Sequence, residues 1–263
     1  MPQIVIDMVL GLVQGLTEFL PVSSSGHLVV VPAVFGWDEP SLSFDLVLHL
    51  GTLVAVVVYF WNDLWGMATG VFGRGADPEG SRRLLLLVAV GTIPAALAGL
   101  LLDGFFESFF EEPLWVCLFW LVTAAVLLLV ERAGGGGDRP LDMRVALLVG
   151  CAQAAAIMPG ISRAGSTIAA GLALGLSRED AARFSFLLSV PAITGAGLTI
   201  VPDIASGSFD VTGSVAAGFV VAALSGYLAV AGLLRLIRTR TLVPFSAYLV
   251  IASPVAATVL IAR

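Results

Sequence analysis

Two short polar stretches hold the side chains that could do chemistry in this otherwise apolar chain. The first, EFLPVSSSGHL, covers residues 18–28, and the second, ISRAGST, covers residues 161–167. Their candidate functional residues are Glu18, Ser23, Ser24, Ser25, Gly26, His27, Ser162, Arg163, Ser166 and Thr167. An arginine beside hydroxyls and backbone N–H groups suits a tetrahedral oxyanion such as phosphate. A serine with a histidine offers a nucleophile or an acid–base pair, so the pattern indicates phosphoryl transfer.

The composition places both stretches in a membrane protein. Hydrophobic residues make up 58% of the 263 residues and charged residues only 12%, and the mean hydropathy is +1.01. Soluble domains have about 25% charged residues. The chain therefore reads as an all-α, polytopic membrane protein, and its net charge of −6 argues against a nucleic-acid partner.

Long apolar runs predict six transmembrane helices, since about 20 apolar residues cross a bilayer. The predicted spans are 45–62, 84–102, 114–130, 184–201, 214–234 and 243–262. Arginines concentrate in the loops at 63–83, 131–144 and 235–240, whereas the loops at 103–113 and 202–213 are acidic. By the positive-inside rule the basic loops are cytoplasmic, which predicts that both termini lie outside the cell.

Two further apolar segments, 1–44 and 141–180, are interrupted by proline, glycine and serine and add no net crossing. Irregular backbone at membrane depth is tolerated only inside protein or along a cavity. Both segments are therefore predicted to be re-entrant helix–loop–helix hairpins, which enter from opposite faces and carry the polar stretches at their tips. We expect the two tips to meet near the bilayer centre, which brings Arg163 towards Ser24 and His27.

The two halves of the chain resemble each other. The segment GLVQGLTEFLPVSSSG from Gly11 can be laid on GCAQAAAIMPGISRAG from Gly150, with small gaps. Each half holds one hairpin and three spans, an odd number, so the second copy must be inverted. The prediction is one membrane domain over 1–263, built from pseudo-repeat halves at about 1–135 and 136–263 in the inverted arrangement of many transporters.

The motifs QGLTEFLPVSSSGHL and MPGISRAGSTIAAGLALGLSREDAARFSFLLSVPA resemble the two signature regions of the undecaprenyl-diphosphate phosphatase family, also called bacitracin-resistance proteins. Motif order, length and the repeat layout agree over essentially the whole chain. The resemblance implies an integral membrane phosphatase in the plasma membrane. Such an enzyme converts a long-chain polyprenyl diphosphate to the monophosphate and recycles the lipid carrier for cell-surface glycan synthesis.

The resemblance also implies roles for individual residues. Ser24 falls on the serine implicated as nucleophile and His27 on the essential histidine, so His27 would take the proton of Ser24 or itself attack phosphorus. Glu18 would orient His27 or, with Gln14, hold Mg²⁺ or Ca²⁺. Arg163 would bind phosphate together with the nearby hydroxyls and amides on Ser23, Ser25, Gly26, Ser162, Ser166 and Thr167.

Two departures from the family pattern affect these roles. Gln14 stands where many members have a second glutamate, which weakens a metal site made of two carboxylates. Ala164 stands where a second serine often follows the arginine, so that hydroxyl is dispensable or is replaced by Ser166.

Other interpretations of the sequence stay open. Inverted repeats and midplane hairpins are also features of transporters, so a polyprenyl-phosphate or other anionic-lipid transporter without hydrolysis is the alternative. His49, one helical turn after Asp45, is either a hydrogen-bonded histidine of its span or a residue that supports the site. A homodimer is a further expectation.

Overall fold

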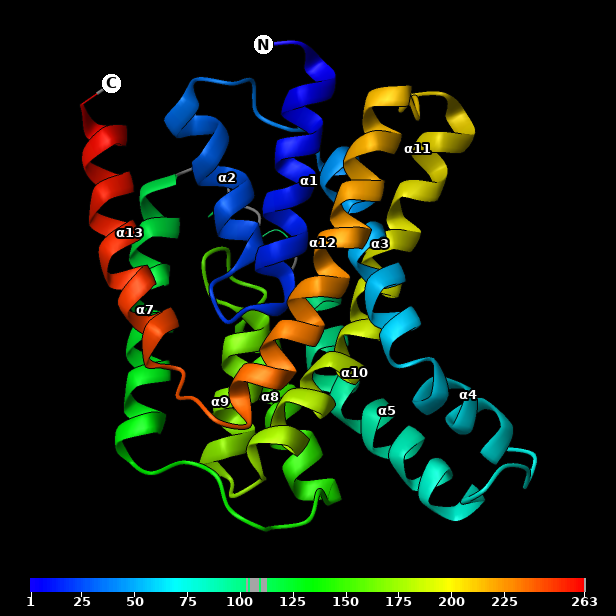
Figure 1. Ribbon diagram of the computed structural model, residues 1–263. Coiled ribbons are helices and arrows are strands. Elements are labelled where there is room, and N and C mark those ends of the chain that lie inside the picture. Colours follow the sequence, from blue (N-terminus) through cyan, green and yellow to red (C-terminus); the bar gives the residue numbers. More distant parts are fainter. Residues whose placement is uncertain (103, 105–108, 110–112, 263) are drawn as a thin grey trace.

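The computed structural model describes residues 1–102, 104, 109 and 113–262, and this part of the chain is helical without strands (Figure 1). The helices are α1 (Gln3–Phe19), α2 (Ser24–Phe35), α3 (Leu42–Tyr59), α4 (Trp61–Gly70), α5 (Pro78–Leu101), α7 (Pro113–Arg132), α8 (Met143–Ala155), α9 (Arg163–Ala173), α10 (Arg178–Gly197), η1 (Leu198–Ile200), α11 (Val201–Ser206), α12 (Gly213–Ile237) and α13 (Val243–Ile261).

Six helical segments in the described residues are long and apolar enough to cross a membrane. They are α3, α5, α7, the continuous stretch Arg178–Ser206, α12 and α13. The prediction of an all-α protein with six spans is confirmed. The chain is a multi-pass membrane protein.

The structure corrects one predicted loop. The segment expected as a loop at 63–83 contains most of α4 and the start of α5. Helix α5 begins at Pro78 because the Asp77 side chain accepts a hydrogen bond from the Gly80 N–H, and proline fits the first helical position. Most of the acidic loop expected at 103–113 lies outside the described residues.

Helices α1 and α2 form one helix–turn–helix unit, and α8 and α9 form a second (Figure 1). The first unit is held against α12 by small residues, since a methyl group at Gly11 would lie 2.3 Å from the carbonyl oxygen of Gly218. In the second unit a methyl group at Gly150 would lie 2.3 Å from the carbonyl oxygen of Gly91 on α5. Close backbone approach at small residues is a common way to pack helices in membranes.

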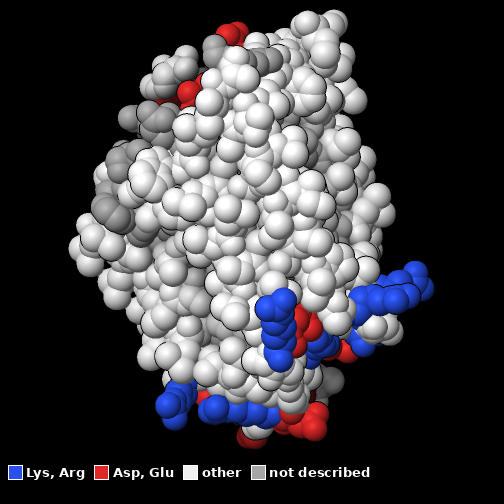
Figure 2. Space-filling view, turned by 90° about the vertical axis from the view of Figure 1, so that its left-hand side faces the viewer, with Lys and Arg blue, Asp and Glu red and all other residues white. Residues whose placement is uncertain are grey.

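The two ends of the molecule differ in charge. Helix α1 begins and α13 ends at the upper end of Figure 1, whereas arginine side chains gather towards the lower end in Figure 2. Ion pairs occur at the helix ends there, such as Arg178 with Glu131 at 2.6 Å and Arg238 with Glu179 at 2.5 Å. The middle of the face shown in Figure 2 displays no charged side chains among the described residues, as expected of a lipid-facing surface.

The first hairpin lies where three apolar clusters meet. Phe19 belongs to the cluster formed with α10, Leu28 to the cluster around the start of α3, and Val22 to the cluster of α7 and α13. Its turn is therefore fixed by packing on several sides, which suits a segment that must hold polar side chains in one geometry.

Candidate active site

The turn of the first hairpin is set by local sequence. Pro21 cannot continue α1, and Ser23 then adopts φ 66°, the one positive φ among the described non-glycine residues. The Ser23 side chain caps α2 by accepting a hydrogen bond from the Gly26 N–H at 3.3 Å. This strained conformation makes Ser24 the first residue of α2, at the tip of the hairpin.

Gly26 allows α7 to approach this tip. A Cβ atom at Gly26 would lie 2.4 Å from Nε1 of Trp120 and 2.9 Å from the Val116 side chain. Gly26 was predicted to offer its backbone amide to the substrate, but that N–H bonds to Ser23 here. The structure thus gives Gly26 a packing role, and the binding of substrate by its N–H stays a prediction.

The tip of the second hairpin is fixed by two hydroxyls. Ser162 caps α9 through a hydrogen bond from the Gly165 N–H at 3.0 Å. The Ser162 N–H donates to Thr123 Oγ1 at 3.0 Å, and the same hydroxyl donates to the carbonyl of Gly160 at 3.1 Å. Arg163 is consequently the first residue of α9, as Ser24 is of α2.

Glu18 joins the two tips. Its Oε2 accepts hydrogen bonds from Ser24 Oγ at 2.5 Å and from Gln14 Nε2 at 3.0 Å. Its Oε1 accepts one from Arg163 Nη2 at 3.0 Å, although the two residues are 145 positions apart. Only 7% of Glu18 is exposed, so a paired and hydrogen-bonded carboxylate is what this burial requires.

A second set of contacts orients Arg163. Its Nη1 donates to the carbonyl oxygen of Ser185 at 3.1 Å. The hydroxyls of Ser185 and Thr167 lie 2.6 Å apart, and Thr167 also donates to the Arg163 carbonyl at 2.8 Å. The guanidinium is therefore held between α1 and α10 and still has N–H groups for another acceptor.

His27 lies in a different environment from Ser24. Its Nδ1 is 2.7 Å from the carbonyl oxygen of Ser23, and its Nε2 is 2.7 Å from Oη of Tyr248 on α13. The imidazole also packs against Trp120, with ring centroids 4.6 Å apart. Both ring nitrogens thus have partners other than Ser24. The expected hydrogen bond from Ser24 to His27 is replaced here by the one from Ser24 to Glu18.

His49 approaches the same carboxylate from α3. Its Nδ1 lies 2.8 Å from the Asp45 carbonyl oxygen, so this nitrogen donates, and its Nε2 lies 3.5 Å from Glu18 Oε2. His49 is therefore hydrogen-bonded within its helix and borders the site, and a role in supporting the site stays a prediction.

The remaining predicted residues are placed less centrally. Ser25 Oγ lies 3.3 Å from Ser23 Oγ. Ser166 takes part through its backbone N–H, which donates to the Ser162 carbonyl at 2.8 Å. Gln14 is fully buried, and its Oε1 has no hydrogen-bond partner in the described part of the chain.

Sequence reasoning missed several residues that build the site: Thr123, Ser185, Trp120 and Tyr248. Each lies inside an apolar helix and contacts the hairpins from far along the chain. The only local signal is a polar or aromatic residue in an apolar run, which is too common in membrane helices to single one out.

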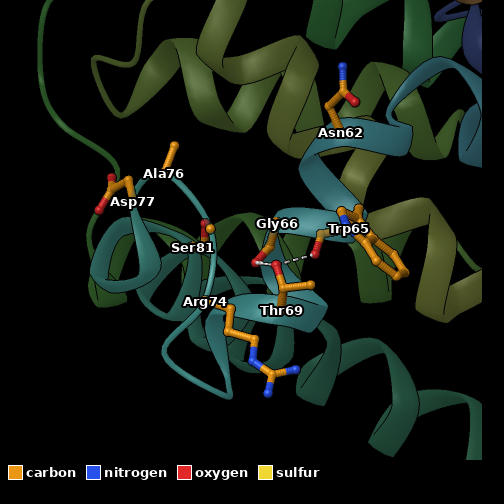
Figure 3. A pocket seen from close by; sticks show the side chains of 9 residues that line it. Asn62, Trp65, Gly66, Thr69, Arg74, Ala76, Asp77 and Ser81 are labelled. Carbon is orange, nitrogen blue, oxygen red and sulfur yellow. Dashed lines mark hydrogen bonds between the residues drawn. The ribbon is translucent and has the colours of Figure 1, made fainter.

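A groove of about 560 Å³ lies elsewhere, between α4 and the start of α5 (Figure 3). It is lined by Trp65, Thr69 and Asp77 among others, and Thr69 donates to the Trp65 carbonyl within it. None of its lining residues belongs to either polar stretch. The groove is therefore separate from the two polar stretches.

The tip geometry supports group transfer to or from a hydroxyl. A serine hydroxyl that donates a hydrogen bond to a buried carboxylate can act as a nucleophile, with that carboxylate as its base. The adjacent guanidinium supplies positive charge where a phosphoryl oxygen would carry negative charge.

Comparison with known proteins identifies relatives over nearly the full length. Residues 7–255 match the family model described as bacitracin resistance protein BacA. A protein of Methanosphaera stadtmanae named undecaprenyl-diphosphatase is 46% identical over 257 residues, which cover 92% of each chain. One of Rubrobacter xylanophilus with the same name is 46% identical and also covers 92% of each chain. Undecaprenyl-diphosphatase 2 of Stutzerimonas stutzeri is 44% identical, covering 94% of this chain and 95% of its own.

Proposed function

The chain belongs to the bacitracin resistance protein BacA family, and on this premise we propose that it is a polyprenyl-diphosphate phosphatase. Its substrate is a long-chain, undecaprenyl-type diphosphate, and its products are the monophosphate and inorganic phosphate. This reaction recycles the lipid carrier for cell-surface glycan synthesis. The observation that carries the proposal concerns the Glu18 carboxylate. It accepts a hydrogen bond from the Ser24 hydroxyl of its own hairpin and another from the Arg163 guanidinium of the second hairpin.

In the proposed first step, Ser24 Oγ attacks the terminal phosphorus and its proton passes to Glu18 Oε2. The bond between that phosphorus and the bridging oxygen breaks, and the polyprenyl monophosphate leaves. Water then hydrolyses the phosphoserine, which releases inorganic phosphate and restores the hydroxyl. Glu18 takes the role of base because its oxygen is 2.5 Å from Ser24 Oγ.

Phosphate binding falls to the second hairpin in this proposal. Arg163 has N–H donors beyond those used for Glu18 and Ser185, and the N-terminal amides of α2 and α9 add further positive potential. The site is largely buried, so these contacts stabilise developing negative charge more strongly than they would in water.

The proposal includes a divalent cation, with Gln14 and Glu18 as its ligands. The buried Gln14 Oε1 lacks a partner within the described residues, and an amide oxygen next to a carboxylate suits Mg²⁺ or Ca²⁺. No group of three or more His, Cys, Asp or Glu residues suited to a metal occurs in the described ranges. Water or the diphosphate itself would complete the coordination, and the cation would neutralise part of the diphosphate charge.

The proposal is tested by phosphate release from a polyprenyl diphosphate in detergent. We expect Ser24→Ala to lose about 10³-fold or more in kcat, because no hydroxyl remains to attack phosphorus. Rapid acid quench of the wild type should trap an acid-stable phosphoserine. An acid-labile, base-stable phosphoenzyme would instead indicate a phosphohistidine, as the alternative with His27 as nucleophile expects.

The alternative of a transporter without hydrolysis predicts no phosphate release from either protein. The names of the relatives favour hydrolysis. If wild type and Ser24→Ala release phosphate equally, and neither a phosphoserine nor a phosphohistidine is trapped, direct attack by water replaces the serine mechanism.

We also propose that the protein resides in the plasma membrane with both termini outside and that the two hairpins are re-entrant. Support comes from helix length: α2 has 12 residues, α8 has 13 and α9 has 11, which is too short to cross a bilayer. The packing of each hairpin on a helix of the other half, at Gly11 and at Gly150, also fits an inverted repeat.

Cysteine labelling in intact cells tests the topology. We expect Ser208→Cys to react with a membrane-impermeant maleimide from outside and Asp138→Cys to react only after permeabilisation. Asp138 is preferable to the nearby Gly136, whose φ of 108° disfavours other residues. A Cys151→Ser background removes the exposed native thiol. Labelling of Asp138→Cys in intact cells would overturn the orientation.

A further inference from the structure

A second groove, of about 530 Å³, lies at the arginine-rich end of the molecule. It is lined from the end of α3, the start of α10 and the end of α12, which are neighbouring helices (Figure 1). Its lining combines three arginines, Arg183, Arg235 and Arg238, with apolar side chains such as Phe60 and Leu234. None of the lining residues belongs to either polar stretch, so this groove is separate from the hairpin tips.

The charges in this groove are not balanced. Arg238 pairs with Glu179 at 2.5 Å, and Arg183 pairs with Asp63 on α4. Arg235 has no hydrogen-bond or ion-pair partner among the described side chains. Each guanidinium carries five N–H donors, so the two paired arginines also keep donors for a further acceptor. The groove therefore favours an anionic group that can accept several hydrogen bonds, such as a phosphate.

The face of α12 that leads to Arg235 is apolar. Leu224, Leu228, Ala231 and Arg235 follow one another at intervals of three or four residues, so they share one face of the helix. Leu224 is 65% exposed and Leu228 is 68% exposed. From Leu224 to Arg235 this face extends roughly 16 Å, close to the hydrocarbon thickness of one leaflet, about 15 Å. An apolar track of the length of one leaflet thus ends at an unpaired guanidinium.

Aromatic side chains around the groove indicate that it lies at the membrane–water border. Tyr59 lines the groove, and its ring centroid is 5.6 Å from that of Tyr227 on α12. Just beyond the end of α3, Trp61 stacks on Trp65 with centroids 5.9 Å apart. Tyrosine and tryptophan are enriched at this depth, because their rings are apolar and carry a polar edge. Lipid headgroups occupy the same depth.

We propose that this groove binds an anionic phospholipid of the surrounding membrane. The lipid phosphate accepts hydrogen bonds from Arg235 and from the free donors of Arg183 and Arg238, while an acyl chain lies along the exposed leucines of α12. A soluble anion would use the arginines and leave the apolar track uncovered. A zwitterionic lipid would bring its own cation into a groove that is already positive. The proposal does not depend on the phosphatase activity.

Native mass spectrometry of the purified full chain in detergent tests the proposal. It gives the Kd of palmitoyl-oleoyl phosphatidylglycerol and of the phosphatidylcholine with the same acyl chains. We expect wild type to bind phosphatidylglycerol more tightly, and Arg235→Gln to weaken this binding about 10-fold, because a charge-assisted hydrogen bond is lost. Arg240→Gln is the matched control. It removes an exposed arginine that does not line the groove and should bind like wild type.

A variant with the opposite sign is available. Glu179→Gln removes the acidic side chain of the lining and should tighten phosphatidylglycerol binding about 3-fold, as expected for one exposed charge pair. Weaker binding in this variant would contradict recognition by the positive charge of the groove.

Thermal melting separates the lipid from free phosphate. Phosphatidylglycerol should raise the Tm of wild type, because a ligand of the folded state stabilises it. Sodium phosphate should have no more effect than sodium chloride at the same ionic strength. Equal affinity of wild type and Arg235→Gln, or equal affinity for the two lipids, would overturn the proposal. A phosphate effect that Arg235→Gln abolishes would make the groove a site for a soluble anion, and a dimer that dissociates in Arg235→Gln would make it an interface with a second copy.

Discussion

Replacing Glu18 with glutamine is expected to lower kcat for phosphate release about 10²-fold to 10⁴-fold, the range of general-base catalysis. The carboxylate oxygen that accepts the Ser24 hydrogen at 2.5 Å becomes part of a neutral amide, so the proton has no acceptor of comparable basicity. Glutamine has almost the same shape, and Arg163 can still donate to its amide oxygen. The loss should therefore appear in kcat more than in KM.

A matched control separates loss of the base from loss of a charge. Glu179→Gln removes an exposed carboxylate, which pairs with Arg238 at the arginine-rich end of the molecule, and should keep kcat at the wild-type value. Thermal melting in detergent checks that Glu18→Gln folds. Near-normal kcat in a folded Glu18→Gln protein would exclude Glu18 as the base and return that role to His27.

The parts of the site predictable from sequence are those encoded by local spacing. Pro21 and the serines that follow it specify a break and a new helix start, and Ser162 does the same before Arg163. Hydropathy likewise predicts the six spans, because every crossing must be apolar over a fixed length. Glu18 is detectable because a carboxylate in an apolar run is costly without a function.

The rest depends on contacts between distant segments. The Tyr248 hydroxyl reaches His27 across 221 positions, and nothing in the surrounding sequence SAYLV marks it as part of a site. Ser185 contributes a backbone carbonyl to Arg163, and any residue type has one. The partner of Ser24 was also not predictable, because both Glu18 and His27 lie within a few residues of it. Only the turn geometry directs the hydroxyl to Glu18.

Replacing Arg163 with lysine is expected to lower kcat/KM about 10²-fold to 10³-fold, the range seen when one transition-state donor is lost. The guanidinium donates from Nη2 to Glu18 and from Nη1 to the Ser185 carbonyl at the same time. A single ammonium cannot reproduce this planar fork and also bind a phosphate oxygen. Glu18, still buried, would then have a poorly placed cation, which adds to the loss.

Arg132→Lys provides the control for the charge-conserving exchange, since Arg132 is exposed at the end of α7 and should tolerate lysine with unchanged kcat/KM. Phosphate release across substrate concentrations gives kcat and KM separately, and the melting temperature reports folding. A large rise in KM would assign Arg163 mainly to substrate binding, whereas a fall in kcat would assign it to the transition state. Activity within a few-fold of wild type would refute the role of Arg163 as the phosphate clamp, because lysine keeps the charge but not the fork geometry.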